Sequence, residues 1–152
     1  MFFSSWIPGS VWRCVLLRLF GAKVGKKVVI KPRVIIKYPW NISLGDYTWI
    51  GEKVWLDSLG KINIGNNCCI SQGAHLICGN HNYKKQSFDL MVGNITLENG
   101  VWIGTLALVT GGVVCGEESV LSAGSIASKS MDSYGIYSGN PALKIRERLI
   151  SR

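Results

Sequence analysis

Small aliphatic residues recur at every sixth position over most of this chain. The first series is Val24, Ile30 and Ile36, and the count resets by two residues before Leu44 and again before Ile64. After a break the series returns as Leu97, Ile103, Val109, Cys115, Leu121 and Ala127. A period of six fits neither the helical repeat nor a simple alternating strand. It predicts a solenoid whose coils have three flat sides, with each aliphatic side chain stacked on its counterpart in the next coil.

The segments at the two ends of the chain lack this rhythm. Residues 1–22 mix apolar and arginine side chains, and we expect an amphipathic helix that caps the open edge of the first coil. In residues 131–152, a Gly139-Asn140-Pro141 turn precedes Ala142 to Ile150. We expect that last segment to form a short helix with alternating basic residues.

A polar segment, residues 79–94, interrupts the β-helix that we assign to residues 23–130. We expect it to leave a coil corner as an excursion loop, within a single all-β domain of residues 1–152. A passive insertion costs little entropy. Loops held on a rigid scaffold are nevertheless where chemistry tends to lie, and this one carries one of the two histidines.

Composition and charge narrow the classes of partner. Hydrophobic residues make up 47% and charged residues 17%, which suits one packed domain, and the net charge is +8. The charge fits a solvated basic surface, a phosphate-bearing ligand or an anionic membrane face. No nucleic-acid motif accompanies it, so we expect no nucleic-acid partner. The apolar run at the start is too short and too interrupted by arginine to span a bilayer, so any contact with the inner membrane would be peripheral.

The five cysteines are odd in number and show no Cys-x-x-Cys spacing. This pattern favours reduced, buried thiols in a cytoplasmic protein, and it predicts no metal site.

His81, in the excursion loop, is the leading candidate for catalysis. Imidazole exchanges a proton near neutral pH, which suits a general base. The alternative is an ordinary surface histidine. His75 falls within the regular repeat at an outward position, where we expect a solvent-facing or interface side chain. Asp57 ends the last hexad of the second coil, where it could orient a histidine, bind a sugar hydroxyl or simply cap backbone amides.

Basic residues gather late in the chain: Lys129, Lys144, Arg146 and Arg148. On the expected helix Lys144 and Arg148 would share a face, because they are four residues apart. A phosphate-binding role and a solvated basic face remain equal alternatives here.

Several phrases together carry a family resemblance. The most specific are Ile95 to Gly104, Ser122-Ala123-Gly124-Ser125 and Gly139-Asn140-Pro141-Ala142, and those that narrow it are Lys37-Tyr38-Pro39-Trp40, Ser71-Gln72-Gly73-Ala74 and Gly79-Asn80-His81-Asn82-Tyr83. With them the chain resembles the hexapeptide-repeat acyltransferases, and among these the colanic-acid and capsule-type exopolysaccharide O-acetyltransferases, which are relatives of the galactoside and maltose acetyltransferases. The resemblance implies a left-handed parallel β-helix, assembled as a homotrimer with acetyl-CoA between neighbouring subunits.

The resemblance also implies roles for individual residues. His81 would be the base that activates the acceptor hydroxyl, and a backbone amide of Gly104 or Thr105 would bind the oxyanion. Acetyl-CoA would contact Trp102, Gly104, Thr105, Ala123, Ser128, Lys129, Lys144 and Arg146. The acceptor, a sugar or lipid-linked glycan, would contact Asp57, Asn80 and Tyr83. Leu143 departs from the galactoside relatives, which have a second basic residue there.

Two other functions share this scaffold. A zinc-dependent carbonic anhydrase needs three histidines per metal, whereas the chain has two. A non-catalytic solenoid that only binds glycan would be expected to lack the loop histidine and the late basic residues, and both are present.

Overall fold

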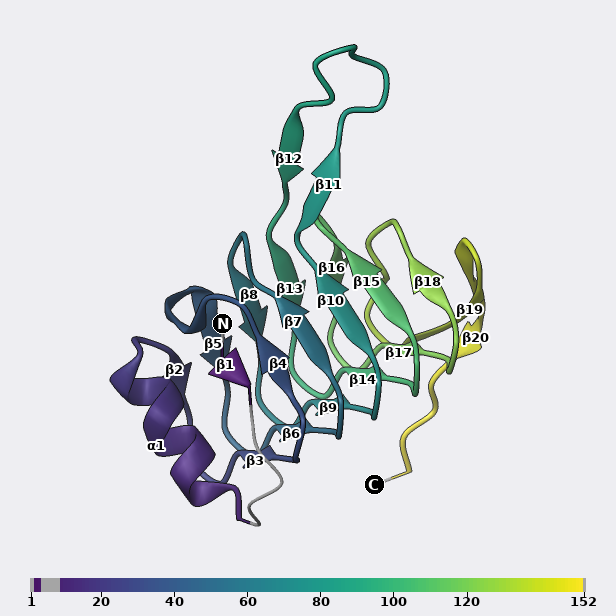
Figure 1. Cartoon of the computed structure of the whole chain (residues 1–152). Helices are drawn as coiled ribbons and strands as arrows, with labels where there is room; N and C mark the ends of the chain where they lie inside the picture. Colours follow the sequence, from purple (N-terminus) through teal and green to yellow (C-terminus); the bar gives the residue numbers. More distant parts are fainter. Residues whose placement is uncertain (1, 4–8, 152) are drawn as a thin grey trace.

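The chain folds into a three-sided parallel β-solenoid, shown in Figure 1 as a computed structural model that describes residues 2–3 and 9–151. Each regular coil adds one strand to each of three sheets, so every sheet takes every third strand of the solenoid. Sheet A contains, in spatial order, β1 (Phe2–Phe3), β4 (Ile35–Ile36), β7 (Trp55–Asp57), β10 (His75–Ile77), β15 (Leu108–Thr110) and β18 (Ile126–Ala127). Sheet B contains β2 (Lys23–Val24), β5 (Ile42–Leu44), β8 (Ile62–Ile64), β13 (Ile95–Leu97) and β16 (Val114–Cys115). Sheet C contains β3 (Val29–Ile30), β6 (Trp49–Ile50), β9 (Cys69–Ile70), β14 (Trp102–Ile103), β17 (Val120–Leu121), β19 (Gly135–Gly139) and β20 (Ala142–Glu147). The predicted parallel β-helix is confirmed.

The aliphatic residues that recur at every sixth position form the core. Each one stacks on the equivalent residue of the next coil. In sheet B, Val24 pairs with Leu44, Leu44 with Ile64, and Ile64 with Leu97. The equivalent columns in the other two sheets are buried as well. Because a strand alternates its side chains, each column leaves an outward position beside it, and these outward positions give the three faces their chemistry.

The corner after sheet B explains the repeated Gly-Asp and Gly-Asn phrases. Asp46 Oδ1 accepts from the Lys26 amide at 2.7 Å, and Asn66 Oδ1 accepts from the Asp46 amide at the same distance. These side chains accept hydrogen bonds from backbone N–H groups that lie in the turns and therefore have no partner in the sheets. The chain also comes so close here that a Cβ on Gly45 would lie 2.5 Å from the carbonyl carbon of Gly65.

Helix α1 (Val11–Leu19) closes the first coil, as predicted for the cap (Figure 1). Its buried side includes Cys14 and Leu17, and Ser10 ties the helix start to Ile30 through Oγ, which accepts from the Ile30 amide at 2.7 Å. Residues 1 and 4–8 of the predicted cap lie outside the described residues. Within the described residues no helix, including the nine-residue α1, is long and apolar enough to cross a membrane.

The end of the chain is a β-hairpin, so the predicted C-terminal helix is wrong. β20 (Ala142–Glu147) runs antiparallel to β19 (Gly135–Gly139) after the turn at Asn140-Pro141. In this segment Leu143 and Ile145 alternate with Lys144 and Arg146, a period of two that suits a strand along the sheet edge. The hairpin continues sheet C at the end opposite to α1 (Figure 1).

Candidate functional site

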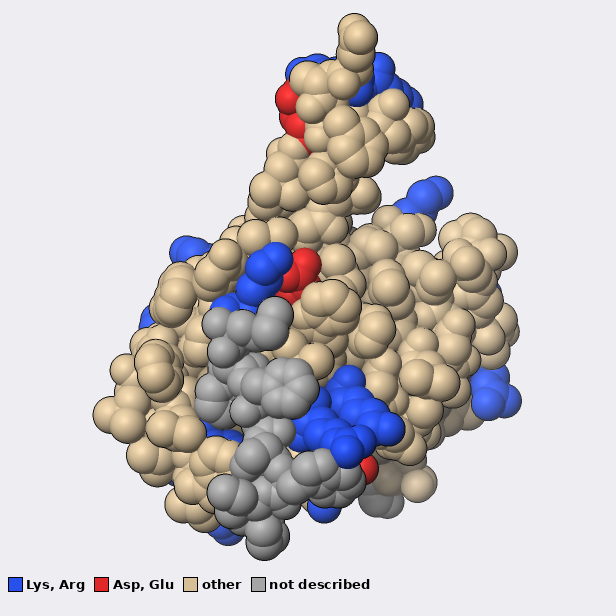
Figure 2. Space-filling view, viewed as in Figure 1, with Lys and Arg blue, Asp and Glu red and all other residues tan. Residues whose placement is uncertain are grey.

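The excursion at residues 79–94 is a β-hairpin that stands out from the solenoid (Figures 1 and 2). Its strands are β11 (Gly79–His81) and β12 (Leu90–Val92), and His81 pairs with Leu90. The hairpin leaves the corner between sheets A and B, directly after β10. Short antiparallel pairing thus gives the predicted loop a defined shape and places His81 on an exposed arm.

Phe88 holds the imidazole of His81 through two contacts, one from its backbone carbonyl and one from its ring. Its Nδ1 lies 2.9 Å from the Phe88 carbonyl oxygen, and the two rings stack with centroids 4.5 Å apart and planes 6° apart. A carbonyl oxygen only accepts hydrogen bonds, so Nδ1 must carry the hydrogen. In the neutral ring the lone pair is therefore on Nε2. This is the tautomer that a general base acting through Nε2 requires.

Asp57 lies at the base of this hairpin. A Cβ on Gly79 would come within 3.6 Å of Asp57 Oδ2, which shows how close the carboxylate is to the start of β11. The side chain is buried and its Oδ1 lies 3.2 Å from Lys37 Nζ. That contact is an ion pair without hydrogen-bond geometry, because Oδ1 accepts no hydrogen bond from the described residues. Asp57 is therefore close enough to the hairpin base to take part in the site, while its role toward an acceptor stays a prediction.

The other predicted acceptor contacts lie farther along the same arm. Asn80 Oδ1 accepts from the His81 amide at 2.8 Å, so this side chain helps to hold β11. Tyr83 is highly exposed in the connection between the strands. Lys85 and Asp89 close that connection with an ion pair of 3.2 Å.

A cavity of about 410 Å³ opens on the outer face of sheet C, toward the C-terminal end. It is lined by Trp102, Gly104, Thr105, Val120, Leu121, Ser122, Ala123, Ile136, Arg146 and Arg148. Five of the residues that the resemblance assigned to acetyl-CoA are therefore brought together here: Trp102, Gly104, Thr105, Ala123 and Arg146. The sequence reasoning missed the apolar lining of Val120 and Ile136; Val120 pairs with Trp102, and Ile136 pairs with Val120 on the next strand.

The wall of this cavity is fixed by the coil ladder. The Trp102 indole Nε1 donates to Ser71 Oγ at 3.0 Å, which sets the angle of the ring. A Cβ on Gly104 would lie 2.5 Å from the Ala123 amide nitrogen, so glycine allows the close approach of the two coils. The Gly104 amide itself donates to the Leu121 carbonyl at 2.8 Å. It is thus occupied within the solenoid, and the expectation that it could bind an oxyanion is wrong; Thr105 remains the candidate.

The hairpin at the chain end separates the basic residues that a helix would have grouped. A bulge shifts the pairing, so that Arg146 lies opposite Ile136 but Lys144 lies opposite Tyr137. Arg146 lines the cavity. Lys144 instead pairs with Glu147 at 2.8 Å and Asp132 at 3.5 Å, and the hydrogen bond to Glu147 raises the pKa of Lys144. The predicted shared face of Lys144 and Arg148 is therefore wrong.

Arg148 supplies the second cation of the cavity, at a place that sequence reasoning had assigned to Lys144. Its Nη1 donates to the Gly100 carbonyl at 2.9 Å and lies 3.0 Å from Glu118 Oε2. This ion pair reduces the positive charge that Arg148 offers to a ligand, so Arg146 is the stronger anion contact. Ser128 and Lys129 do not line this cavity; they follow β18 at the same corner that the hairpin leaves two levels earlier in the stack, after β10.

Four of the five cysteines, Cys14, Cys68, Cys78 and Cys115, are core residues, whereas Cys69 is half-buried. Burial raises the pKa of Cys115 to about 12 and that of Cys68 to about 11, so both thiols stay protonated and unreactive at neutral pH. All five cysteines are free. Among residues 2–3 and 9–151, no three histidine, cysteine or acidic side chains gather as a metal site.

With this geometry established, comparison with known proteins gives a consistent result. The chain is 44% identical over 147 residues to the putative colanic acid biosynthesis acetyltransferase WcaF of Escherichia coli, covering 95% of this chain and 81% of WcaF. It is 29% identical over 135 residues to the galactoside O-acetyltransferase of the same organism, covering 87% of this chain and 66% of that enzyme. No protein-family model matches the chain.

Solved structures agree with the fold. A galactoside acetyltransferase in complex with coenzyme A superposes with a TM-score of 0.86 at 27% identity, over 94% of this chain and 74% of that one. A hexapeptide-repeat-containing acetyltransferase from Vibrio cholerae gives a TM-score of 0.89 at 23% identity, over 96% and 85% of the two chains.

Proposed function

The chain belongs to the hexapeptide-repeat acetyltransferases, and from this membership we propose that it transfers acetyl from acetyl-CoA to a sugar hydroxyl during exopolysaccharide, capsule or O-antigen synthesis. The observation that carries the proposal is the 44% identity to WcaF across 95% of the chain. Galactoside O-acetyltransferase is a second sugar-modifying relative. Acetyl-CoA is a cytoplasmic metabolite, which supports a cytoplasmic location for the proposed reaction.

The cavity on sheet C supports the donor half of the proposal. It combines an apolar wall, from Trp102, Val120 and Ile136, with the guanidinium of Arg146. A coenzyme A chain needs both, because its pantetheine arm is largely apolar and its phosphates are anionic. The solved structure of a galactoside acetyltransferase is a complex with coenzyme A. We therefore assign this cavity to acetyl-CoA.

His81 supports the acceptor half. A sugar hydroxyl is a poor nucleophile until its proton is removed. Nε2 of His81 takes that proton as the oxygen attacks the thioester carbonyl carbon, and the C–O bond forms. The tetrahedral intermediate collapses with cleavage of the C–S bond, and the imidazolium returns the proton to the coenzyme A thiolate. Nδ1 keeps its hydrogen bond to the Phe88 carbonyl throughout, which stabilises the positive ring.

Within one chain these two halves lie on different faces. The hairpin leaves the corner between sheets A and B (Figure 1), whereas the cavity opens on sheet C. A neighbouring subunit can bring its cavity to this hairpin, which supports a homotrimer with the site between subunits. In that arrangement Ser128 and Lys129, on the same corner as the hairpin, would meet the donor bound to the neighbour.

The outward positions of the three sheets support this assembly. Sheet A presents a mostly apolar row of Ile35, Trp55, His75, Leu108 and Ile126, and sheet C presents Val29, Trp49, Cys69, Trp102, Val120 and Ile136. Sheet B presents the more polar row of Lys23, Ser43, Asn63, Thr96 and Val114. A ring of three joins two different surfaces of each subunit and leaves the third in water. Two apolar faces and one polar face match that requirement.

Release of free thiol from acetyl-CoA in the presence of candidate sugars tests the proposal. We expect His81→Ala to lower turnover at least roughly 100-fold, the lower end of a general base contribution, with acetyl-CoA binding retained. Lys84→Ala, an exposed change in the same hairpin, is the matched control and should keep normal turnover. Near-normal turnover of His81→Ala would remove the histidine from the mechanism, and absence of transfer to any sugar would contradict the assigned activity.

A further inference from the structure

The net charge of this protein lies entirely in its first 45 residues. That stretch contains eight basic residues and no Asp or Glu, which gives +8, and residues 46–152 contain nine basic and nine acidic residues, which cancel. The eight are Arg13, Arg18, Lys23, Lys26, Lys27, Lys31, Arg33 and Lys37. A charge so unevenly divided is a feature of proteins that bind an extended anionic surface.

The solenoid gathers these charges at one end of the molecule. Helix α1 and the first coil form that end, and Lys26, Lys27, Lys31 and Arg33 occupy the two turns that join β2, β3 and β4. Lys26 and Lys27 are exposed. Figure 2 shows basic side chains in blue around this part of the body as well as on the hairpin tip. The basic N-terminal stretch of the sequence therefore forms a basic surface at one end of the solenoid.

The same end exposes an apolar stripe. Val11, Val15 and Leu19 recur every fourth residue along α1 and are 79%, 46% and 75% exposed, and Phe20, which follows the helix, is 57% exposed. A capping helix that faces only water would carry polar residues on this side, because its buried side is already filled by Cys14 and Leu17. Four large apolar side chains in a row are not needed to close the solenoid.

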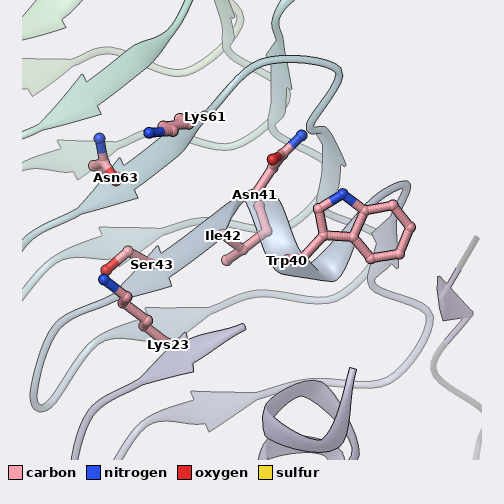
Figure 3. A pocket seen from close by; sticks show the side chains of 7 residues that line it. All are labelled: Lys23, Trp40, Asn41, Ile42, Ser43, Lys61 and Asn63. Atoms are coloured by element: carbon pink, nitrogen blue, oxygen red, sulfur yellow. The ribbon is translucent and has the colours of Figure 1, made fainter. Parts of the chain in front are cut away.

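Trp40 extends the stripe to a polar cavity. The indole is 60% exposed and comes from the 3-10 helix η1 (Pro39–Asn41); a Cβ on Gly21, just after α1, would lie 3.1 Å from its Cβ. Beside it is a cavity of about 320 Å³, lined by Lys23, Trp40, Asn41, Ile42, Ser43, Lys61 and Asn63 (Figure 3). Of the described carboxylates, none forms an ion pair with Lys23 or Lys61. Two ammonium groups with a hydroxyl and amides suit a phosphate.

We propose that this end of the solenoid is a docking surface for an anionic lipid bilayer. Val11, Val15, Leu19, Phe20 and Trp40 enter the interface between headgroups and acyl chains, the surrounding lysines meet the headgroup phosphates, and the cavity beside Trp40 receives one of them. Charge complementarity selects this occupant. Nucleic acid would satisfy the lysines but would leave the apolar stripe in water, and an uncharged protein partner would leave the exposed lysines of this end, such as Lys23, Lys26 and Lys27, unmatched.

Flotation of the purified full chain on vesicles tests the proposal, and it needs neither acetyl-CoA nor an acceptor, so it is independent of the proposed function. The protein should float with vesicles of phosphatidylcholine and phosphatidylglycerol and remain behind with phosphatidylcholine alone. Added salt should weaken the flotation. We expect Val15→Asp and Leu19→Asp each to weaken binding to the vesicles at least about tenfold. The double variant Lys26→Gln with Lys27→Gln should weaken it by a similar factor. Each change removes about 1.4 kcal/mol of interfacial free energy, which corresponds to tenfold in affinity.

Matched variants far from the surface complete the test. Leu149→Asp changes an apolar residue that is 92% exposed near the other end, and Lys84→Gln with Lys85→Gln changes adjacent lysines on the hairpin. Both should bind vesicles like the unchanged protein. Val15 and Leu19 are exposed, so their variants should keep the oligomeric state and the thermal transition of the unchanged protein; should one misfold, the lysine pair decides. Failure to float on anionic vesicles, or flotation that the α1 and lysine variants leave unchanged, overturns the proposal.

Discussion

At His81, one backbone carbonyl determines which ring nitrogen can act as a base. The Phe88 carbonyl fixes the hydrogen on Nδ1, and the Phe88 ring stacks on the imidazole to fix its plane. The two effects are separable, because a change of side chain removes the stacking and leaves the carbonyl. Phe88 thus acts through His81 as a positioning residue, on an arm that is otherwise exposed.

We expect Phe88→Ala to lower kcat by roughly tenfold, less than the loss of a general base, because the imidazole remains but samples more orientations. The KM for acetyl-CoA should not change, since the proposed donor cavity lies on sheet C. Steady-state kinetics with both substrates varied separates the two parameters. Gln86→Ala, two residues away and exposed, is the control. A higher KM for acetyl-CoA with unchanged kcat would contradict the positioning role.

Sequence alone located His81 but could not show how it is held, because the contact with Phe88, seven residues later, depends on the pairing of β11 with β12. The donor residues came from the resemblance, and five of them share the sheet C cavity. Arg148 was missed because the expected helix placed it beside Lys144. The alternation of Leu143, Lys144, Ile145 and Arg146 was the available signal for a strand, and it was outweighed by residues that also favour helices.

Among the elements, the coil corners set how closely successive turns can stack. Each sheet B strand ends in an aliphatic residue that is followed by glycine in the first three coils, and at Gly45 the backbone of the next coil occupies the space of a side chain. The aliphatic period, and with it the register of successive coils, could therefore be predicted from the sequence. The position of the excursion in the chain could be predicted, but its hairpin conformation could not, because nothing in its polar composition indicates that β11 and β12 pair.

We expect Gly45→Ala to lower the free energy of unfolding by roughly 1–3 kcal/mol, because its Cβ would lie 2.5 Å from a backbone atom of Gly65 that cannot move without separating the coils. For a chain of this size each kcal/mol lowers Tm by about 2–4 °C. Thermal unfolding followed by circular dichroism measures the shift. Ser43→Ala, on the outward side of the same strand, should change Tm little. An unchanged Tm for Gly45→Ala would show that the coils can separate at this corner without cost.

For the whole molecule, the division of faces matters more than any single contact. The core could be predicted from the six-residue period. The role of each face depends on the outward residues, and their contacts with other subunits cannot be seen in a single chain. Sheets A and C are apolar and sheet B is polar, and the donor cavity and the hairpin lie apart within one chain. Assembly and activity are therefore coupled in the proposed trimer: a chain that folds alone would still hold both halves of the site but could not join them.

Leu108→Arg tests that coupling. Leu108 is an outward, half-buried residue of β15 in the apolar row of sheet A, next to His75 and Ile126. In an isolated chain the arginine can reach water, so the coil should still fold. In an interface it would bury a charge without a partner, which is strongly unfavourable. We expect the variant to run at the mass of a single chain in size exclusion with light scattering, and to lose turnover at least about 100-fold because the hairpin no longer meets a neighbour's cavity.

Thr96→Arg is the matched change on the polar face. Thr96 occupies an outward position of β13 in sheet B, between Asn63 and Val114. It should remain trimeric and active, because this face is proposed to meet water. If instead Leu108→Arg assembled normally while Thr96→Arg did not, sheet B would be the interface, and the route by which His81 reaches the donor would have to pass over that face. A monomeric but fully active Leu108→Arg would show that a single chain can close the distance between the hairpin and the cavity, which the solenoid could achieve only by a large movement of β11 and β12.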